Sequence, residues 1–164
     1  MTKVRFVSSL EELPDRATIA SMSGLAFLQA IADGELPGPP IGEAMGCHVH
    51  SVEAGRVIFR GSPAFSAMNP IGSVHGGWFG TLLDSCMSCA VQSMLPKGTG
   101  YTTLEYKVNL LRPMFPDGTE IEAIGTAIHV GRRTGTAEGQ IVGLSDGKIY
   151  ATGTATCLVI DISG

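Results

Sequence analysis

The sequence predicts an α+β domain in which one long helix packs against an antiparallel sheet. One observation is the run GGWFGTLLDSCMSCAVQSML over residues 76–95, which is mostly apolar, lacks lysine and arginine, and carries a single acid. The other is a series of strand-like segments on both sides of it, joined by tight turn signals. A helix that is apolar on most sides must be covered by such a sheet, and strands joined by short turns pair antiparallel.

The segment before the long helix predicts a short helix and a β-hairpin. Residues 1–22 are polar and weakly patterned, and we expect them to form a flexible N-terminal lead. Residues 23–32 read SGLAFLQAIA, with a serine start and apolar residues at helical spacing, and a PGPP loop follows. Residues 47–54 and 56–62 flank Gly55 and predict two paired strands.

The segment after the long helix predicts four strands. Pro96 ends the helix, and residues 101–111 then alternate between apolar and polar side chains. Three further strands are expected, with the first turn at Gly131-Arg132-Arg133 and the second at Ser145-Asp146-Gly147. These three strands cover residues 119–130, 134–144 and 148–160.

Composition indicates one domain, over residues 23–164, and argues against several classes of partner. The 164 residues are 44% hydrophobic, enough for one substantial core. The net charge of −4 gives no basic footprint for nucleic acid. An uninterrupted membrane-spanning run and a signal peptide are not indicated, so we expect a cytoplasmic protein without a membrane partner.

Asp84 is the only acidic residue between Ala54 and Leu104. It lies with Thr81, Ser88 and Gln92 on one narrow polar stripe of the long helix. A buried carboxylate is costly unless it is hydrogen-bonded or paired. Asp84 is therefore either a structural acid bonded to a nearby hydroxyl or amide, or a catalytic acid.

The glycines that open the helix predict a place for a ligand carbonyl. The first amides of a helix have no partner within the helix, and Gly76 and Gly77 lack side chains that would block their approach. Asp84 follows Gly76 by eight residues, which is about 12 Å along a helix axis. Both groups cannot touch one carbonyl from the same chain, so a shared site predicts a twofold dimer with Gly76 and Asp84 from different protomers.

Two segments resemble a known family. NPIGSVHGGWFGTLLDSCM and the later YKVNLLRPM resemble the hotdog-fold acyl-CoA thioesterases of the phenylacetate-degradation and 4-hydroxybenzoyl-CoA thioesterase type. The resemblance covers roughly residues 42–160. It implies a hotdog fold, in which a curved antiparallel sheet wraps a long central helix and two protomers join with their helices adjacent.

The resemblance also implies roles for motif residues. The Gly76 amide would polarise the thioester carbonyl, and Asp84 would act as nucleophile or general base. Asn69 and His75 match the family positions before the helix, and Ser88 would position the attacking water or the acid. His75 also has a structural interpretation, in which its ring bonds to backbone and fixes the loop.

The resemblance implies an acyl-CoA substrate with no metal and no separate cofactor. The Gly77 amide lies beside the carbonyl site, and Arg112, Arg132 and Arg133 are candidates for the CoA phosphates, although each is equally well explained as a solvated turn arginine. We expect hydrolysis of a small acyl- or aryl-CoA thioester at a dimer interface, in a homodimer or a dimer of dimers. The helix over residues 23–32 either caps the acyl pocket or seals the open end of the sheet.

Other functions are less well supported by the sequence. A hotdog dehydratase or hydratase would require a different spacing of histidine and acid, and a non-catalytic acyl-CoA binder would have little use for Asp84. Cys86 and Cys89 form a CxxC motif, but it lies deep inside the helix rather than at its start, where a redox thiolate is stabilised. His48 and His50 share one face of a strand without an evident third metal ligand.

Overall fold

A six-stranded antiparallel sheet forms the body of the computed structural model, which describes residues 4–164. The spatial order of the strands is β1-β2-β4-β5-β6-β3, and each neighbouring pair is antiparallel. The strands are β1 (Cys47–Glu53), β2 (Arg56–Gly61), β3 (Thr99–Leu110), β4 (Ile121–Val130), β5 (Thr134–Gly143) and β6 (Ile149–Asp161). The α+β prediction and all six strands are confirmed, with boundaries shifted by at most a few residues.

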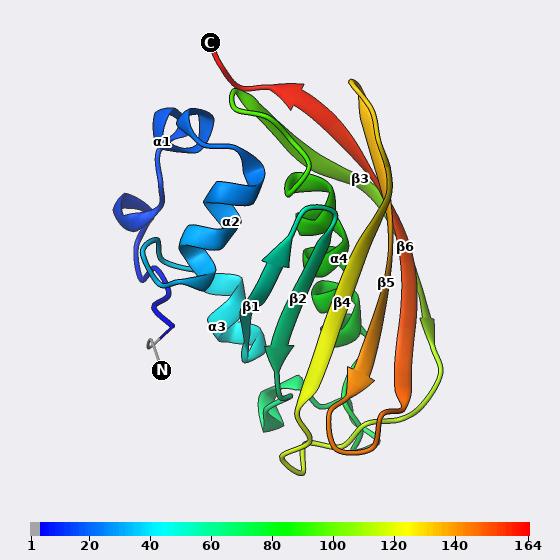
Figure 1. Ribbon diagram of the computed structural model, residues 1–164. Coiled ribbons are helices and arrows are strands. Elements are labelled where there is room, and N and C mark those ends of the chain that lie inside the picture. The colour runs from blue at the N-terminus through cyan, green and yellow to red at the C-terminus, as the bar shows by residue number, and fades with distance from the viewer. Residues whose placement is uncertain (1–3) are drawn as a thin grey trace.

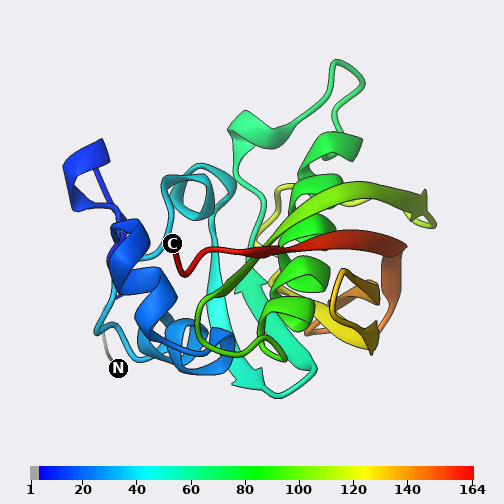
Figure 2. The same cartoon turned by 90° about the horizontal axis from the view of Figure 1, so that it is seen from above.

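The long helix α4 (Gly76–Gln92) lies in the concave face of the curved sheet (Figure 2). Its leucines, Cys86 and Met87 are fully buried and form the centre of the hydrophobic core. Glycines on the facing strands allow the close approach, because a Cβ at Gly125 would overlap the Cys86 carbonyl oxygen. The sheet thus fixes the position and the rotation of α4.

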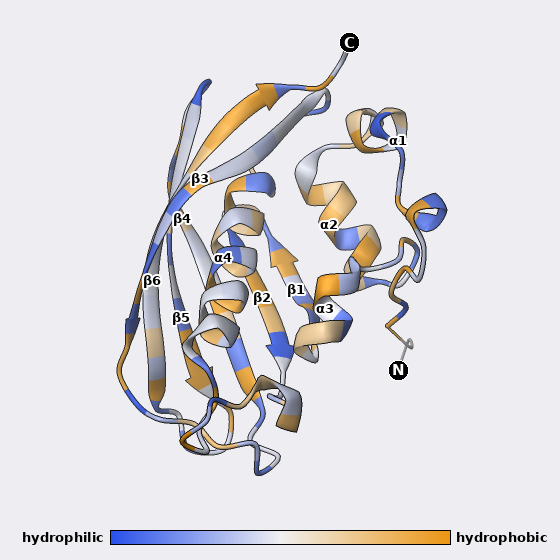
Figure 3. Ribbon diagram, turned by 180° about the vertical axis from the view of Figure 1, so that it is seen from behind, coloured by the Kyte–Doolittle hydropathy of each residue, from blue (hydrophilic) through white to orange (hydrophobic). Residues whose placement is uncertain are grey.

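Four short helical segments form a layer beside β1 and the C-terminal end of α4 (Figure 1). They are η1 (Leu10–Glu12), α1 (Arg16–Ser21), α2 (Gly24–Ala32) and α3 (Pro40–Met45). Figure 3 shows that α2 and the neighbouring strands β1 and β2 carry many hydrophobic residues. Helix α2 confirms the helix predicted over residues 23–32, with Ser23 as its N-cap.

Residues 4–22 of the predicted N-terminal lead dock against the rest of the chain; residues 1–3 lie outside the described residues. Val7 is only 3% exposed, and its N–H donates to the Gly38 carbonyl at 3.0 Å. The Gly98 N–H donates to the Ala20 carbonyl at 2.9 Å, which ties α1 to the start of β3. These contacts are made with residues distant in sequence, so the local pattern of the segment gives no sign of them.

Helix α3 begins at the last proline of the predicted PGPP loop, and residues 37–39 remain outside any helix. Proline is tolerated in the first turn of a helix, where its missing N–H needs no partner, and Pro40 occupies that position. Gly46 closes the helix with φ 65°, a conformation that glycine adopts without strain. No helix within residues 4–164 is long and apolar enough to cross a membrane.

Candidate active site

His75 caps the N-terminus of α4. Its Nδ1 accepts a hydrogen bond from the Gly77 N–H at 2.9 Å, so the ring bonds to the backbone at the helix start. The Gly76 N–H, in contrast, donates to no group among residues 4–164. One open backbone donor therefore stands at the positive end of a long helix, where a carbonyl oxygen acquiring negative charge is stabilised.

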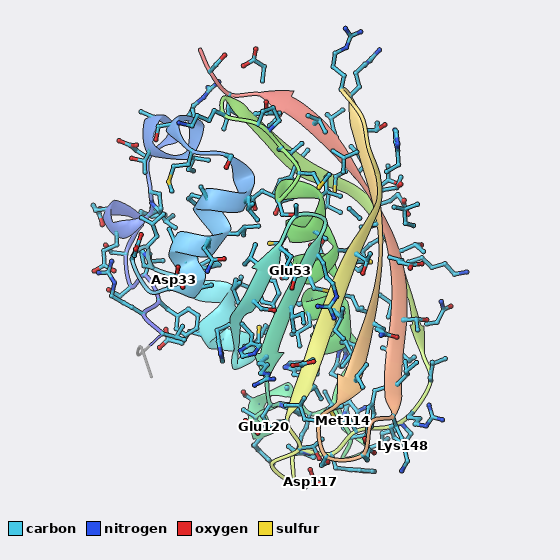
Figure 4. The ribbon with its side chains drawn as sticks, in the orientation of Figure 1. Asp33, Glu53, Met114, Asp117, Glu120 and Lys148 are labelled. Carbon is cyan, nitrogen blue, oxygen red and sulfur yellow. The ribbon has the colours of Figure 1, made fainter. Side chains whose placement is uncertain are left out.

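The loop before α4 holds this terminus in place. The His75 N–H donates to the Ala67 carbonyl at 2.8 Å, and the Val74 N–H donates to the Met114 carbonyl at 2.8 Å. Figure 4 labels Met114 at the end of the sheet where the loop between β3 and β4 passes. The start of α4 is thus anchored to two separate segments.

Asn69 shapes the same loop from within. Its Oδ1 accepts from the N–H groups of Ile71 and Ser73, both at 3.1 Å, and its Nδ2 donates to Ser73 Oγ at 2.9 Å. These bonds are typical of an asparagine that stabilises a turn. The structure therefore gives Asn69 a supporting position behind the helix start.

Asp84 lies about two turns further along α4 and is half-buried. Its Oδ1 accepts a hydrogen bond from Thr103 Oγ1 at 2.9 Å, and within residues 4–164 no other donor contacts the carboxylate. The carboxylate lines a cavity of about 720 Å³. A carboxylate held by one donor, with its second oxygen open to a cavity, can act as a nucleophile or accept a proton.

Thr103 is the site residue that sequence reasoning missed. It extends from β3, two residues after Tyr101, so both side chains lie on the strand face that looks toward α4. The polar character of these two inward positions was the available signal. The apolar alternation that begins at Leu104 obscured it, because the β3–β6 register shifts between Thr103 and Glu105.

Ser88 is buried one turn after Asp84, but it does not contact the acid. Its Oγ lies 3.3 Å from the Tyr101 hydroxyl and donates to the Ser85 carbonyl at 3.4 Å. Burial raises the pKa of Tyr101 well above its ordinary value, so the phenol stays protonated. The Ser88–Tyr101 pair forms part of the polar wall of the cavity that contains Asp84.

Family comparison agrees with this arrangement. Residues 71–150, which include the helix start, Asp84 and Thr103, match the model of the Thioesterase superfamily. Over these residues the chain is similar to the thioesterase domain of that superfamily. A protein of Halobacterium salinarum whose name proposes an esterase is 36% identical over 77 residues, which are 46% of this chain and 49% of that protein. The match thus spans about half of that curated relative.

Solved structures extend the similarity over the thioesterase domain and its surroundings. The Escherichia coli protein from the phenylacetic acid degradation operon is 25% identical, with a TM-score of 0.72 over 85% of this chain and 96% of that one. A phenylacetic acid degradation-related protein of Ralstonia eutropha is 28% identical, with a TM-score of 0.72 over 80% of this chain and 98% of that one. These similarities confirm the predicted hotdog fold and the resemblance to thioesterases of the phenylacetate-degradation type.

The three arginines considered for CoA do not form one cluster in the thioesterase domain. Arg112 follows β3, and its guanidinium donates to the Ile149 carbonyl at 2.6 Å. Arg132 and Arg133 are exposed on the β4–β5 turn, at the other end of the sheet. A strand of ten residues such as β4 spans roughly 33 Å, so the two groups cannot hold the same phosphate within one chain.

The buried cysteines are poorly suited to thiolate chemistry. Burial raises the pKa of Cys47 to about 11 and that of Cys89 to about 12, and it raises the pKa of Cys86 further still. A thiol of this kind stays protonated near neutral pH and is a weak nucleophile. Within residues 4–164, no group of three histidine, cysteine or acidic side chains is arranged to hold a metal ion, and His48 and His50 have no third partner there.

Proposed function

We propose that this chain hydrolyses the thioester bond of an acyl- or aryl-CoA at a site shared by two protomers. The observation that carries the proposal is the pair of open groups on α4: the Gly76 N–H without an acceptor and the Asp84 carboxylate with one donor. The thioesterase domain and the structural similarity to proteins of phenylacetic acid degradation support this chemistry.

The Gly76 amide stabilises the oxyanion in this proposal. As the carbonyl carbon becomes tetrahedral, negative charge develops on its oxygen, and the Gly76 N–H at the helix N-terminus donates to it. His75 occupies the neighbouring Gly77 amide, so it leaves one donor rather than two. In this proposal His75 has a positioning role, the Gly77 amide makes no substrate contact, and the Gly76 amide keeps the role expected of it.

Asp84 supplies the second function. Its open oxygen either attacks the carbonyl carbon, forming a mixed anhydride that water then hydrolyses, or takes a proton from the water that attacks directly. In both routes the carbon–sulfur bond breaks, CoA leaves as the thiol after protonation, and the acyl group leaves as the free acid. Thr103 keeps Oδ1 occupied and so directs the other oxygen toward the cavity.

Two chains are needed because the helix separates these groups. Gly76 and Asp84 lie eight residues apart on α4, about 12 Å along its axis. A partner α4 running antiparallel brings the Gly76 amide of one protomer to Asp84 of the other, and twofold symmetry then builds two sites. The dimer, a dimer of dimers and the cytoplasmic location all stay predictions.

The remaining candidate residues have smaller roles in the proposal. Ser88 supports the polar wall through Tyr101, and Asn69 stabilises the loop that carries His75. The CoA phosphates contact either Arg112 or the pair Arg132 and Arg133. One protomer cannot bring both sets to the same phosphate. Charge reversal of each set in turn, read as a change in KM for the same acyl-CoA, identifies which set binds.

Release of free CoA thiol from a panel of acyl- and aryl-CoA thioesters tests the proposed function. We expect turnover that depends on Asp84, and no hydration of an enoyl-CoA in a parallel assay. Hydration without thiol release would instead indicate a hydratase. Tight acyl-CoA binding without turnover of any thioester would indicate a binding protein, and either result would refute the proposal.

A further inference from the structure

The cavity that contains Asp84 is closed on its far side by the N-terminal helical layer. Its walls come from α1, α2 and α3 with their connecting segments, from β1 and β2, and from the polar stripe of α4 and the start of β3. The helical layer and the strands contribute apolar side chains, among them Ile19, Phe27, Ile31, Met45 and Phe59. The cavity is therefore apolar on the side of the helical layer, β1 and β2, and polar along α4 and the start of β3.

The helical layer is attached firmly enough to serve as a wall. The Gly24 N–H donates to the Leu95 carbonyl at 3.0 Å, and a Cβ at Gly24 would overlap the Gln92 carbonyl oxygen, so the start of α2 contacts the end of α4 directly. Trp78 Nε1 donates to the Met45 carbonyl at 2.9 Å and ties α3 to the other half of α4. Figure 2 shows the layer beside α4, on the side away from β4 and β5.

Charge in the cavity is confined to one residue. Asp84 is the only carboxylate among the described lining residues, which include no lysine, arginine or histidine, and burial raises the pKa of the other titratable groups, Cys47, Cys89 and Tyr101. A substrate whose acyl group carries a carboxylate would place a second negative charge near Asp84. The described lining residues offer no cation to balance it. An uncharged acyl group brings no second charge into the cavity and can cover its apolar wall.

We propose that this cavity is the acyl-binding site and that α1–α3 select a medium-length, uncharged alkyl or aryl acyl group. The proposal rests on the proposed function and adds the substrate class. At about 720 Å³, the cavity lies in the upper part of the range of ligand pockets, about 300–1,000 Å³. An acetyl group would leave most of its apolar wall without contact, whereas an octanoyl or phenylacetyl group would cover it.

The first test is the dependence of kcat/KM on the acyl group. From acetyl- to octanoyl-CoA we expect kcat/KM to rise by about fourfold per methylene until the cavity is filled. Succinyl-CoA should be hydrolysed at least about tenfold more slowly than butyryl-CoA, because its carboxylate is repelled by Asp84 and loses solvation. A flat profile, or equal rates for succinyl- and butyryl-CoA, would overturn the inference and leave thioester hydrolysis standing.

The second test changes the wall. Ile31→Trp should lower kcat/KM for octanoyl-CoA by at least about tenfold and change kcat/KM for butyryl-CoA by no more than about twofold, because Ile31 lines the apolar wall and the larger side chain takes up volume that a longer acyl chain needs. Leu25→Ala, on the same helix but outside the cavity and 37% exposed, should leave the whole profile unchanged. If Ile31→Trp does not fold, Phe27→Ala replaces it and should reduce the preference for octanoyl- over butyryl-CoA.

A binding measurement separates this inference from the proposed function. The affinity of a non-hydrolysable octanoyl-CoA thioether, measured by calorimetry, should fall at least about tenfold in Ile31→Trp and should not change in Leu25→Ala. That result supports the cavity even if no thioester is hydrolysed. Equal affinity of wild type and a folded Ile31→Trp would refute the acyl site even if hydrolysis is observed.

Discussion

Asp84 holds a carboxylate toward an apolar cavity with one hydrogen bond and, within residues 4–164, no salt bridge. Asp84→Asn keeps the shape of the side chain and an oxygen that accepts from Thr103, while it removes the charge. We expect kcat/KM for thioester hydrolysis to fall at least about a hundredfold. Thiol release measures the loss, and thermal unfolding serves as the control for folding. Near wild-type turnover in the Asp84→Asn variant would exclude the acid from the mechanism.

Gly76 and Gly80 provide a matched pair on α4. A Cβ at Gly76 would lie 3.0 Å from Leu110 Cδ1, and one at Gly80 would lie 3.5 Å from the Tyr106 hydroxyl, so both substitutions point at β3. Gly76→Ala should crowd the open amide and lower kcat by about tenfold or more, since a complete loss of such a donor costs ~2.7–4 kcal/mol. Gly80→Ala should keep activity and add about 0.5–1 kcal/mol of stability.

Kinetics and chemical denaturation of the two variants measure both effects. A loss of stability in Gly76→Ala that matches its loss of turnover would show that this glycine serves helix packing and not the oxyanion.

The cysteines give a pH-dependent prediction. The pKa of Cys47 is raised from 9.0 to about 11 by burial, so above pH 9.0 the unfolded chain releases the thiol proton before the folded one does. The free energy of unfolding should therefore fall as pH rises from 9.0 toward about 11. Near neutral pH, thiol reagents should modify the folded protein slowly and the denatured protein fully.

Denaturation curves as a function of pH and thiol titration check these expectations. Cys89→Ala should retain thioesterase activity; its loss, together with rapid modification of Cys89, would indicate a catalytic thiol.

Sequence predicted part of the site at the residue scale. Asp84 was visible because it was an isolated acid in an apolar helix, and Gly76 because a helix start leaves free amides. Thr103 was not visible, since its contact with Asp84 joins residues 19 apart and depends on how β3 passes the helix. The hydrogen bonds of Asn69 and His75 within the loop were not visible either, because they depend on how the loop folds.

At the element scale, the crossing of α2 and α4 leaves no room for a single added methyl group. A Cβ at Gly24 would overlap the Gln92 carbonyl oxygen, and backbone atoms cannot rotate away as a side chain can. Gly24→Ala should therefore destabilise the protein by about 1–3 kcal/mol. Chemical denaturation measures the change, and Leu25→Ala on the exposed face is the control. Wild-type stability in the Gly24→Ala variant would show that α2 is not held at this position.

Elements were predictable where their pattern was long. The helix over residues 76–92 and the strands of 10 to 13 residues repeat their apolar pattern enough times to be recognised. Helices α1 and α3 have six residues each and too few turns for such a pattern. Their stability comes from contacts with β1, α4 and the chain ends, which local sequence does not encode.

At the scale of the whole molecule, β3 is an edge strand with large apolar side chains in solvent. Leu104, Tyr106 and Leu110 are 57%, 46% and 55% exposed. Isolated apolar residues are common on protein surfaces, but three on one open edge favour a further chain as cover. This exposure supports the dimer that the spacing of Gly76 and Asp84 requires.

Subunit exchange between two inactive variants tests the shared site most directly. Asp84→Asn lacks the acid, and Gly76→Val blocks the amide, so neither homodimer should release thiol at an appreciable rate. If each site takes Gly76 from one chain and Asp84 from the other, the mixed dimer has one intact site. After exchange, with heterodimers verified by mass, we expect about half of the wild-type activity per heterodimer. No recovery in verified heterodimers would place both groups in one chain and contradict the two-chain mechanism.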